Sequence, residues 1–172
     1  HQRIDLSMKD ALLTPAHTVS VASPQPVKTT DPSPSNVFFC PEETRFYSQC
    51  LEKMVLSQCS GAERIVEFGA GDGSAVINSL RKSAFNGVIH GYELSATACQ
   101  AARSQIRRQG LTNRYIIHNQ CFFDGLEQSP AQCLIANPPY IPAPDAGILM
   151  PELHGGIDGS AITKALLNVG CE

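Results

Sequence analysis

Between residues 64 and 136, two hydrophobic patterns alternate along the chain. Short apolar runs typical of buried strands are followed by segments in which apolar residues recur every three or four positions, as in amphipathic helices. Such alternation predicts an α/β fold with a doubly wound, mostly parallel sheet and helices on both faces. We expect strands at 64–68, 87–94, 113–118 and 133–136, and helices at 74–83 and 96–110.

Two further regions flank this alternating segment. Residues 1–36 are rich in proline, serine and threonine and show no sustained period, so we expect an arm or linker there. The domain itself is expected to cover residues 37–172. It should begin with an amphipathic helix over 41–59, whose first turn carries acidic residues, and end with a short helix over 160–169.

A glycine-rich turn, GAGDG, joins the first strand to the next helix. Gly69, Gly71 and Gly73 can adopt backbone angles that other residues avoid, which lets a ligand approach the main chain. Glu93 ends the second strand, where a carboxylate can accept both ribose hydroxyls of an adenosine-containing ligand. The G-x-G-x-G spacing differs from the dinucleotide pattern and favours a ligand without a pyrophosphate. The alternative is a purely structural turn beside a surface charge.

The fourth strand ends in Asn137-Pro138-Pro139-Tyr140. The prolines prevent the strand from continuing, because each fixes φ and lacks an amide N–H. In a doubly wound sheet the fourth strand flanks the first, so Asn137 is expected beside Gly71 at the edge where ligands bind. The Asn137 side-chain oxygen and the Pro138 carbonyl can then hold both N–H groups of a planar amino group and direct its lone pair, while Tyr140 stacks on it. An ordinary turn is the alternative.

Taken together, these motifs resemble those of the class I S-adenosylmethionine-dependent methyltransferases. VEFGAGDG and YELS are similar to the first two motifs of that class, and NPPY is similar to the fourth motif of its amino-group methyltransferases. NPPYIP followed by GGIDG, together with CPEETRFYSQCL before the first strand, most resembles the release-factor glutamine methyltransferases. The resemblance implies a Rossmann-like fold, S-adenosyl-L-methionine as cofactor, and N-methylation of a glutamine side chain in a release-factor-like protein.

The resemblance also implies roles for individual residues. Cofactor contacts are implied for Glu67, Gly69, Ala70, Gly71, Gly73, Glu93, Leu94, Cys121, Phe122 and Asn137. Catalytic roles are implied for Asn137, Pro138 and Tyr140, and substrate contacts for Asn137, Pro138, Pro139 and Tyr140.

The chain departs from the family pattern in three places. The arm over residues 1–36 is too short and irregular to be the helical substrate-recognition domain that the release-factor enzymes carry. Gln120 or Cys121 stands where the family carries the acid of its third motif, near the end of the third strand. The sequence ends one helix after the fourth strand, so we expect a sheet without the C-terminal strands of the full seven-stranded fold. Either the sequence is a fragment of a longer protein or another component supplies the rest. The altered third motif and the short chain favour a function of a different class, a non-catalytic methyltransferase-like binding subunit.

The overall composition constrains the partners and the surroundings of the chain. A net charge of −3 gives no broad basic surface, which disfavours methylation of an RNA or DNA base without excluding it. A nicotinamide-binding enzyme is a further alternative function, beside base methylation and the non-catalytic binding subunit. Seven cysteines without metal-ligand spacing indicate reduced thiols in a cytoplasmic protein without a metal, with one or two disulfides as the alternative. No apolar run is long enough to span a membrane, so we expect a soluble protein with no membrane partner.

Overall fold

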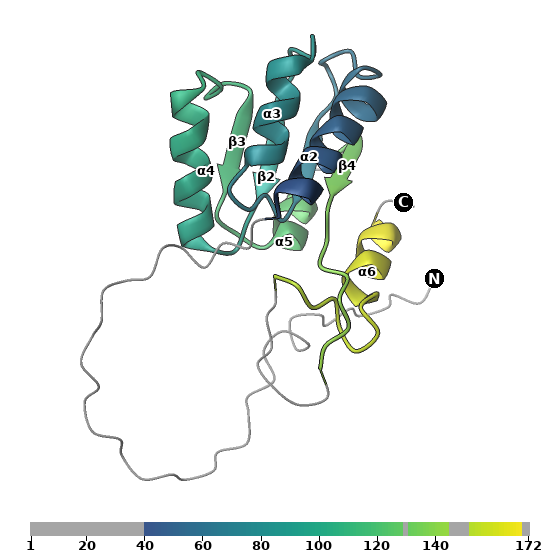
Figure 1. Ribbon diagram of the computed structural model, residues 1–172. Coiled ribbons are helices and arrows are strands. Elements are labelled where there is room, and N and C mark those ends of the chain that lie inside the picture. The colour runs from purple at the N-terminus through teal and green to yellow at the C-terminus, as the bar shows by residue number, and fades with distance from the viewer. Residues whose placement is uncertain (1–39, 129–130, 145–151, 170–172) are drawn as a thin grey trace, which may run out of the picture. The chain divides into compact units, whose positions relative to one another are not determined.

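Four parallel strands in the order β3-β2-β1-β4 form the sheet of the domain (Figure 1). The computed structural model describes residues 40–128, 131–144 and 152–169, and the predicted arm over residues 1–36 lies outside these ranges. The predicted Rossmann-like α/β fold is confirmed, including the position of the fourth strand beside the first. The strands are β1 (Ile65–Phe68), β2 (Ile89–Tyr92), β3 (Tyr115–His118) and β4 (Cys133–Ala136).

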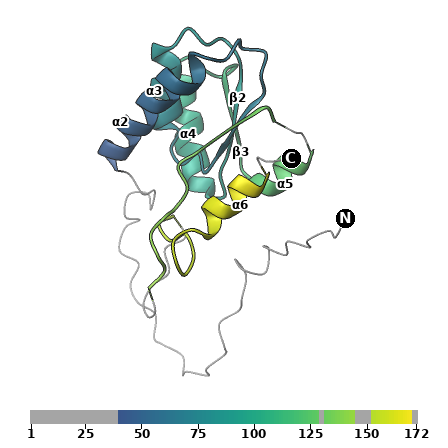
Figure 2. The same ribbon diagram turned by 90° about the vertical axis from the view of Figure 1, so that its right-hand side faces the viewer.

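Helices cover both faces of this sheet, as Figure 2 shows in side view. One face packs against α2, α3, α4 and the short π-helix η1, and the other packs against α5 and α6. Alternate strand residues supply the two cores: Ile65 of β1 faces the first group of helices and Val66 faces the second. The helices are α2 (Pro41–Cys50), η1 (Leu51–Leu56), α3 (Ser74–Lys82), α4 (Ala96–Arg108), α5 (Phe122–Gln128) and α6 (Ala161–Val169).

The first predicted helix is interrupted by a change of helical type. It begins at Pro41 as expected, but from Leu51 to Leu56 it is a π-helix, and it ends before the predicted residue 59. Leu51 and Leu56 are five residues apart and both buried, whereas Met54 between them is exposed. The wider π turn therefore places both leucines on the side that faces the core.

One helix, α5, was not predicted from the sequence. Its central residue, Gly125, is a poor helix former, which hid the element from propensity reasoning. The structure explains the glycine, because a Cβ at this position would collide with the ring of Tyr92. Packing against the sheet therefore requires glycine at position 125, despite the low helix propensity of glycine.

The strand register aligns the carboxyl ends of three strands. Phe68, the last residue of β1, pairs with Tyr92 at the end of β2 and with Ala136 at the end of β4. The glycine turn, Glu93 and Asn137 therefore leave the sheet at one edge, which we call the carboxyl edge. Within the described ranges, no helix is long and apolar enough to cross a membrane.

Candidate functional site

The glycine turn is held tightly at the carboxyl edge. Gly69, Gly71 and Gly73 all have positive φ angles, of 67°, 55° and 77°. The amides of Gly69 and Ala70 both donate to the Tyr92 carbonyl, at 3.0 and 3.1 Å. At Gly69 and Gly71 no other described residue lies within 4 Å of where a Cβ would be, so the main chain there is open to a ligand on the described side.

Glu93 lies directly against this turn. One carboxylate oxygen accepts the Gly71 amide at 2.9 Å and the other accepts the Ser95 amide at 2.8 Å. A carboxylate oxygen can accept a second hydrogen bond, so both oxygens retain the capacity to receive a ribose hydroxyl. Turn and acid therefore form one unit, with Leu94 exposed beside them.

Two residues that sequence reasoning missed support this unit. Asn119, which follows β3, donates its side-chain amide to the carbonyls of Glu93 and Leu94 at 2.9 and 3.0 Å. Asp72 accepts the amide and hydroxyl of Ser74 at the start of α3, and the Gln105 side chain of α4 donates to it. The only sequence signal was the position of Asp72 just before Ser74, which suits the start of a helix.

Glu67 lies beneath the glycine turn with its side chain in the core. Only 3 % of it is exposed, and its carboxylate accepts a hydrogen bond from the Tyr115 hydroxyl. Burial raises the Glu67 pKa to about 7, Tyr115 opposes this rise, and the charge of Glu93 adds to it. The Tyr115 ring also lies where a Cβ on Gly73 would point. This pair supports the turn from below, and a direct contact between Glu67 and a cofactor stays a prediction.

Cys121 and Phe122, two of the residues with an implied cofactor contact, lie at the start of α5. Phe122 is buried and packs edge-to-face against Phe68 and Tyr92, with ring centroids 5.5 and 5.7 Å apart. Cys121 is partly exposed, and its carbonyl accepts the Gly125 amide at 3.1 Å, which begins the helix. Phe122 is thus a core residue, while the predicted cofactor contacts of both residues stay predictions.

The tetrapeptide Asn137–Tyr140 follows β4 and borders a small pocket. The pocket has a volume of about 90 Å³, and two acidic residues, Glu43 and Glu152, lie among its lining residues. Since a water molecule occupies about 30 Å³, this space holds only a few atoms, on the order of a side-chain amide. Asn137 is exposed, and Pro138 and Pro139 are partly exposed.

The GGIDG segment packs against the main chain of the tetrapeptide. Ile141 forms an isolated parallel bridge with His154, and the Gly155 amide donates to the Ile141 carbonyl at 2.9 Å. A Cβ on Gly155 would collide with the Pro139 carbonyl, and a Cβ on Gly159 would collide with that of Tyr140. The two motifs therefore form one structure, which explains why glycines stand at these positions.

Tyr140 reaches across the pocket to the first helix. Its hydroxyl donates to the carboxylate of Glu43, in the first turn of α2, and this hydrogen bond together with the nearby charge raises the Tyr140 pKa. Tyr140 is 55 % exposed, so part of the residue is accessible to a ligand. The contact joins residues 97 positions apart, which sequence reasoning did not connect.

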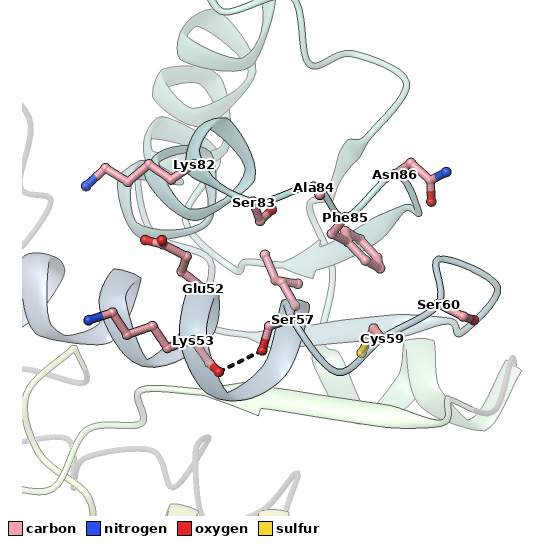
Figure 3. Close-up of a pocket in the computed structure, with 11 residues that line it drawn as sticks. Glu52, Lys53, Ser57, Cys59, Ser60, Lys82, Ser83, Ala84, Phe85 and Asn86 are labelled. Atoms are coloured by element: carbon pink, nitrogen blue, oxygen red, sulfur yellow. Dashed lines mark hydrogen bonds between the residues drawn. The ribbon is translucent and has the colours of Figure 1, made fainter.

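A larger hollow lies away from these residues (Figure 3). It has a volume of about 650 Å³ and is lined by η1, the end of α3 and the loops that precede β1 and β2. Figure 3 shows the ammonium groups of Lys53 and Lys82 pointing away from Phe85. None of the predicted site residues lines this hollow.

Two features of the described residues bear on metal binding and on cysteine chemistry. They contain no group of three or more His, Cys, Asp or Glu side chains that could hold a metal ion. The cysteines described at positions 40, 50, 59, 99, 121 and 133 are free thiols, and Cys171 lies outside the described ranges.

Comparison with known proteins gives relatives but no family-level match. No protein-family model matches the chain. It is 30 % identical over 118 residues to a release factor glutamine methyltransferase of Gloeobacter violaceus, covering 63 % of this chain and 41 % of that protein. It is 25 % identical over 116 residues to a ribosomal protein uL3 glutamine methyltransferase of Bradyrhizobium diazoefficiens, covering 63 % and 36 %. These relatives confirm the resemblance predicted from the motifs.

Similar solved structures also carry methyltransferase names. An O-methyltransferase from Bacillus cereus in complex with SAH has a TM-score of 0.46 and 22 % identity, covering 60 % of this chain and 47 % of that one. An RNA methyltransferase from Salinibacter ruber in complex with S-adenosyl-L-homocysteine has a TM-score of 0.44 and 20 % identity, covering 54 % and 56 %. The chain spans about two fifths of the length of the curated relatives it matches.

Proposed function

We propose that this chain is an S-adenosylmethionine-dependent N-methyltransferase domain that acts on a glutamine side chain in a protein. The observation that carries the proposal is the strand register: it brings the glycine turn, Glu93 and the tetrapeptide from Asn137 to one edge of a parallel sheet. Ligands of doubly wound folds bind at this edge. The similarity to glutamine methyltransferases supports the same function.

The residues at the carboxyl edge fit S-adenosylmethionine. The open main chain at Gly69 and Gly71 would let a ligand approach closely, and the Glu93 carboxylate beside it would accept ribose hydroxyls. The turn presents no pyrophosphate-binding spacing, which favours this cofactor over a dinucleotide. When bound, the cofactor supplies an electrophilic methyl group on a sulfonium.

The tetrapeptide would hold the substrate amide. An amide nitrogen is a poor nucleophile because its lone pair is delocalised into the carbonyl. Acceptors at the Asn137 side-chain oxygen and the Pro138 carbonyl would fix both N–H groups and direct the lone pair towards the methyl carbon. The amide nitrogen would accept the methyl group that the bound sulfonium supplies, and would then release a proton to water. Tyr140 would support the planar group by stacking.

The chemistry of the small pocket favours a protein over a nucleic acid. Among the described residues, its lining contains Glu43 and Glu152 and no basic residue. Carboxylates at the entrance repel phosphate groups, whereas they accept hydrogen bonds from peptide amides and basic side chains. Because release factors and ribosomal proteins belong to the translation machinery, we place the proposed reaction in the cytoplasm.

Transfer of a labelled methyl group tests the proposal. The 172-residue chain is incubated with labelled S-adenosylmethionine and a bacterial release factor, ribosomal protein uL3 or bulk RNA. We expect label in a glutamine of one of the proteins. Label only in RNA would replace the proposal with base methylation.

Calorimetry separates catalysis from binding. We expect S-adenosylhomocysteine to bind and NAD not to bind. Replacing Asn137→Ala should leave this affinity nearly unchanged while lowering methyl transfer by at least about 100-fold, since a lost positioning interaction at a reacting group has an effect of this order. Binding without transfer to any of the three substrates would instead identify a non-catalytic binding subunit.

A further inference from the structure

Glu43 lies far from the tetrapeptide in sequence but contacts it in the fold. The Glu43 carboxylate accepts the Tyr140 hydroxyl, and both residues line the small pocket that contains Asn137. The proposed mechanism uses the ring of Tyr140 but assigns nothing to its hydroxyl. The hydrogen bond therefore needs an explanation beyond stacking.

The main chain of Tyr140 is already fixed from the other side. A Cβ on Gly159 would collide with the Tyr140 carbonyl, and the amide of the next residue, Ile141, donates to the Leu153 carbonyl at 3.0 Å. These contacts set the backbone but leave the side-chain torsions of an exposed tyrosine free. Glu43 supplies the second restraint, which determines where the ring lies.

The helix that carries Glu43 is rigidly attached to the helix that begins at the glycine turn. The Ser79 hydroxyl of α3 lies within hydrogen-bond distance of the Ser48 carbonyl and hydroxyl of α2, at 2.9 and 3.2 Å. Both serines are buried. A continuous set of contacts thus runs from the turn through α3 and α2 to the Tyr140 hydroxyl.

We propose that Glu43 is a positioning residue for methyl transfer, which holds the Tyr140 hydroxyl so that the ring lies across the pocket at Asn137. This role rests on the function proposed above. It makes α2 part of the substrate site, because the helix that packs against α3 also orients the residue that contacts the substrate. Replacing Glu43 should therefore lower the rate of methyl transfer to the substrate and leave the affinity for the cofactor largely unchanged.

A titration tests the contact independently of activity. The chain contains four tyrosines, and the spectrum of 13C-tyrosine-labelled protein can be assigned for Tyr140 with Tyr140→Phe. In Glu43→Gln the Tyr140 hydroxyl should titrate at lower pH than in the wild type. Glu42→Ala removes a carboxylate from the same helical turn and should leave the titration unchanged. An unchanged titration in Glu43→Gln would overturn the proposal.

Kinetics test the positioning role. With release factor as substrate, Glu43→Ala and Tyr140→Phe should each lower kcat/KM roughly tenfold, since small displacements of positioning groups have effects of this size. The double variant should be no slower than either single variant, because both remove one interaction. Glu43→Gln keeps an acceptor oxygen and should recover part of the rate, while S-adenosylhomocysteine affinity should not change in any variant.

The outcomes separate the two proposals. Additive losses in the double variant, or full activity in Glu43→Ala, would contradict positioning through Tyr140 while leaving the methyltransferase intact. A wild-type chain that transfers no methyl group would refute the proposed function, and the positioning role with it. The titration would still report whether the contact forms. Thermal unfolding of Glu43→Ala beside Glu42→Ala controls for a loss of helix stability.

Discussion

Replacing the buried acid beneath the glycine turn, Glu67→Gln, should stabilise the protein at neutral and higher pH. The Glu67 carboxyl has an ordinary pKa of 4.5 when exposed, and burial raises it to about 7 in the folded chain. Above pH 4.5 the unfolded chain loses this proton while the folded chain keeps it, so stability falls as pH rises through this window. Glutamine cannot ionise, and its oxygen can still accept the Tyr115 hydroxyl.

The magnitude follows from the two pKa values. A tenfold change in an equilibrium constant corresponds to about 1.4 kcal/mol, so keeping the proton from pH 4.5 to about pH 7 corresponds to roughly 3 kcal/mol. Between pH 4.5 and about pH 7 the wild type should lose this amount of unfolding free energy relative to Glu67→Gln. Above pH 7 the difference between the two proteins should stay constant. The difference between the two proteins isolates Glu67, because other titrating groups contribute equally to both.

Urea unfolding at several pH values between 2 and 8.5 provides the assay, with midpoint and slope fitted at each pH. Glu63→Gln is a matched control, because its effect on stability should have the opposite sign to that of Glu67→Gln. Hydrogen bonds from the Ser60 amide and hydroxyl and from the Gly61 amide lower the Glu63 pKa to about 2, so its removal should take away stability that the wild type gains as pH rises. If the free energies of unfolding of the wild type and Glu67→Gln changed with pH in parallel, the conclusion that Glu67 is buried and keeps its proton would be wrong.

Three further predictions concern other parts of the fold. His118→Gln should show a smaller loss of stability between pH 8 and pH 5 than the wild type, because burial lowers the pKa of His118 and folding therefore opposes its protonation. Gly159→Ala should cost roughly 1–3 kcal/mol in urea unfolding, since φ is 75° and the new Cβ meets the Tyr140 carbonyl. Asn119→Ala should weaken S-adenosylhomocysteine binding in calorimetry, because the loop that carries Glu93 loses two hydrogen bonds.

Each of these has its own control. His90 is hydrogen-bonded to His118 at 3.0 Å and its pKa is also lowered, so His90→Gln should give a similar flattening of the curve. Gly110 has a φ of 68° with open space around it, so Gly110→Ala reports the cost of the backbone angle alone. An equal loss in Gly110→Ala and Gly159→Ala would argue against the collision with Tyr140. Unchanged affinity in Asn119→Ala would show that the loop needs no such support.

Local patterns predicted the sheet and the main parts of the candidate site. The apolar runs of β1 to β4 and the glycine turn are properties of neighbouring residues, and parallel topology follows from the helices between them. Gly71 and Glu93 lie just beyond the carboxyl ends of neighbouring strands, which is why they are close in the fold. Sequence reasoning was sufficient wherever the determining interactions are close along the chain.

The features that were missed depend on tertiary contacts. Helix α5 contains Gly125 because a Cβ at this position would collide with Tyr92. The burial of Glu67 against Tyr115 follows from packing between strands and helices. The contact between Glu43 and Tyr140 joins distant segments, and nothing in either segment indicates the other. Such pairings appear only once the fold brings the segments together.

The central position of β1 also sets the order in which the candidate site can assemble during synthesis. Ile65 pairs with Ile89 on one side but with Cys133 on the other, so β1 remains an unpaired edge until β4 has left the ribosome. The half that carries Gly71 and Glu93 can therefore form early, whereas the half that carries Asn137 must wait for a contact distant in the chain. A nascent chain halted before β4 should thus acquire the part of the site proposed for the cofactor well before the part proposed for the substrate.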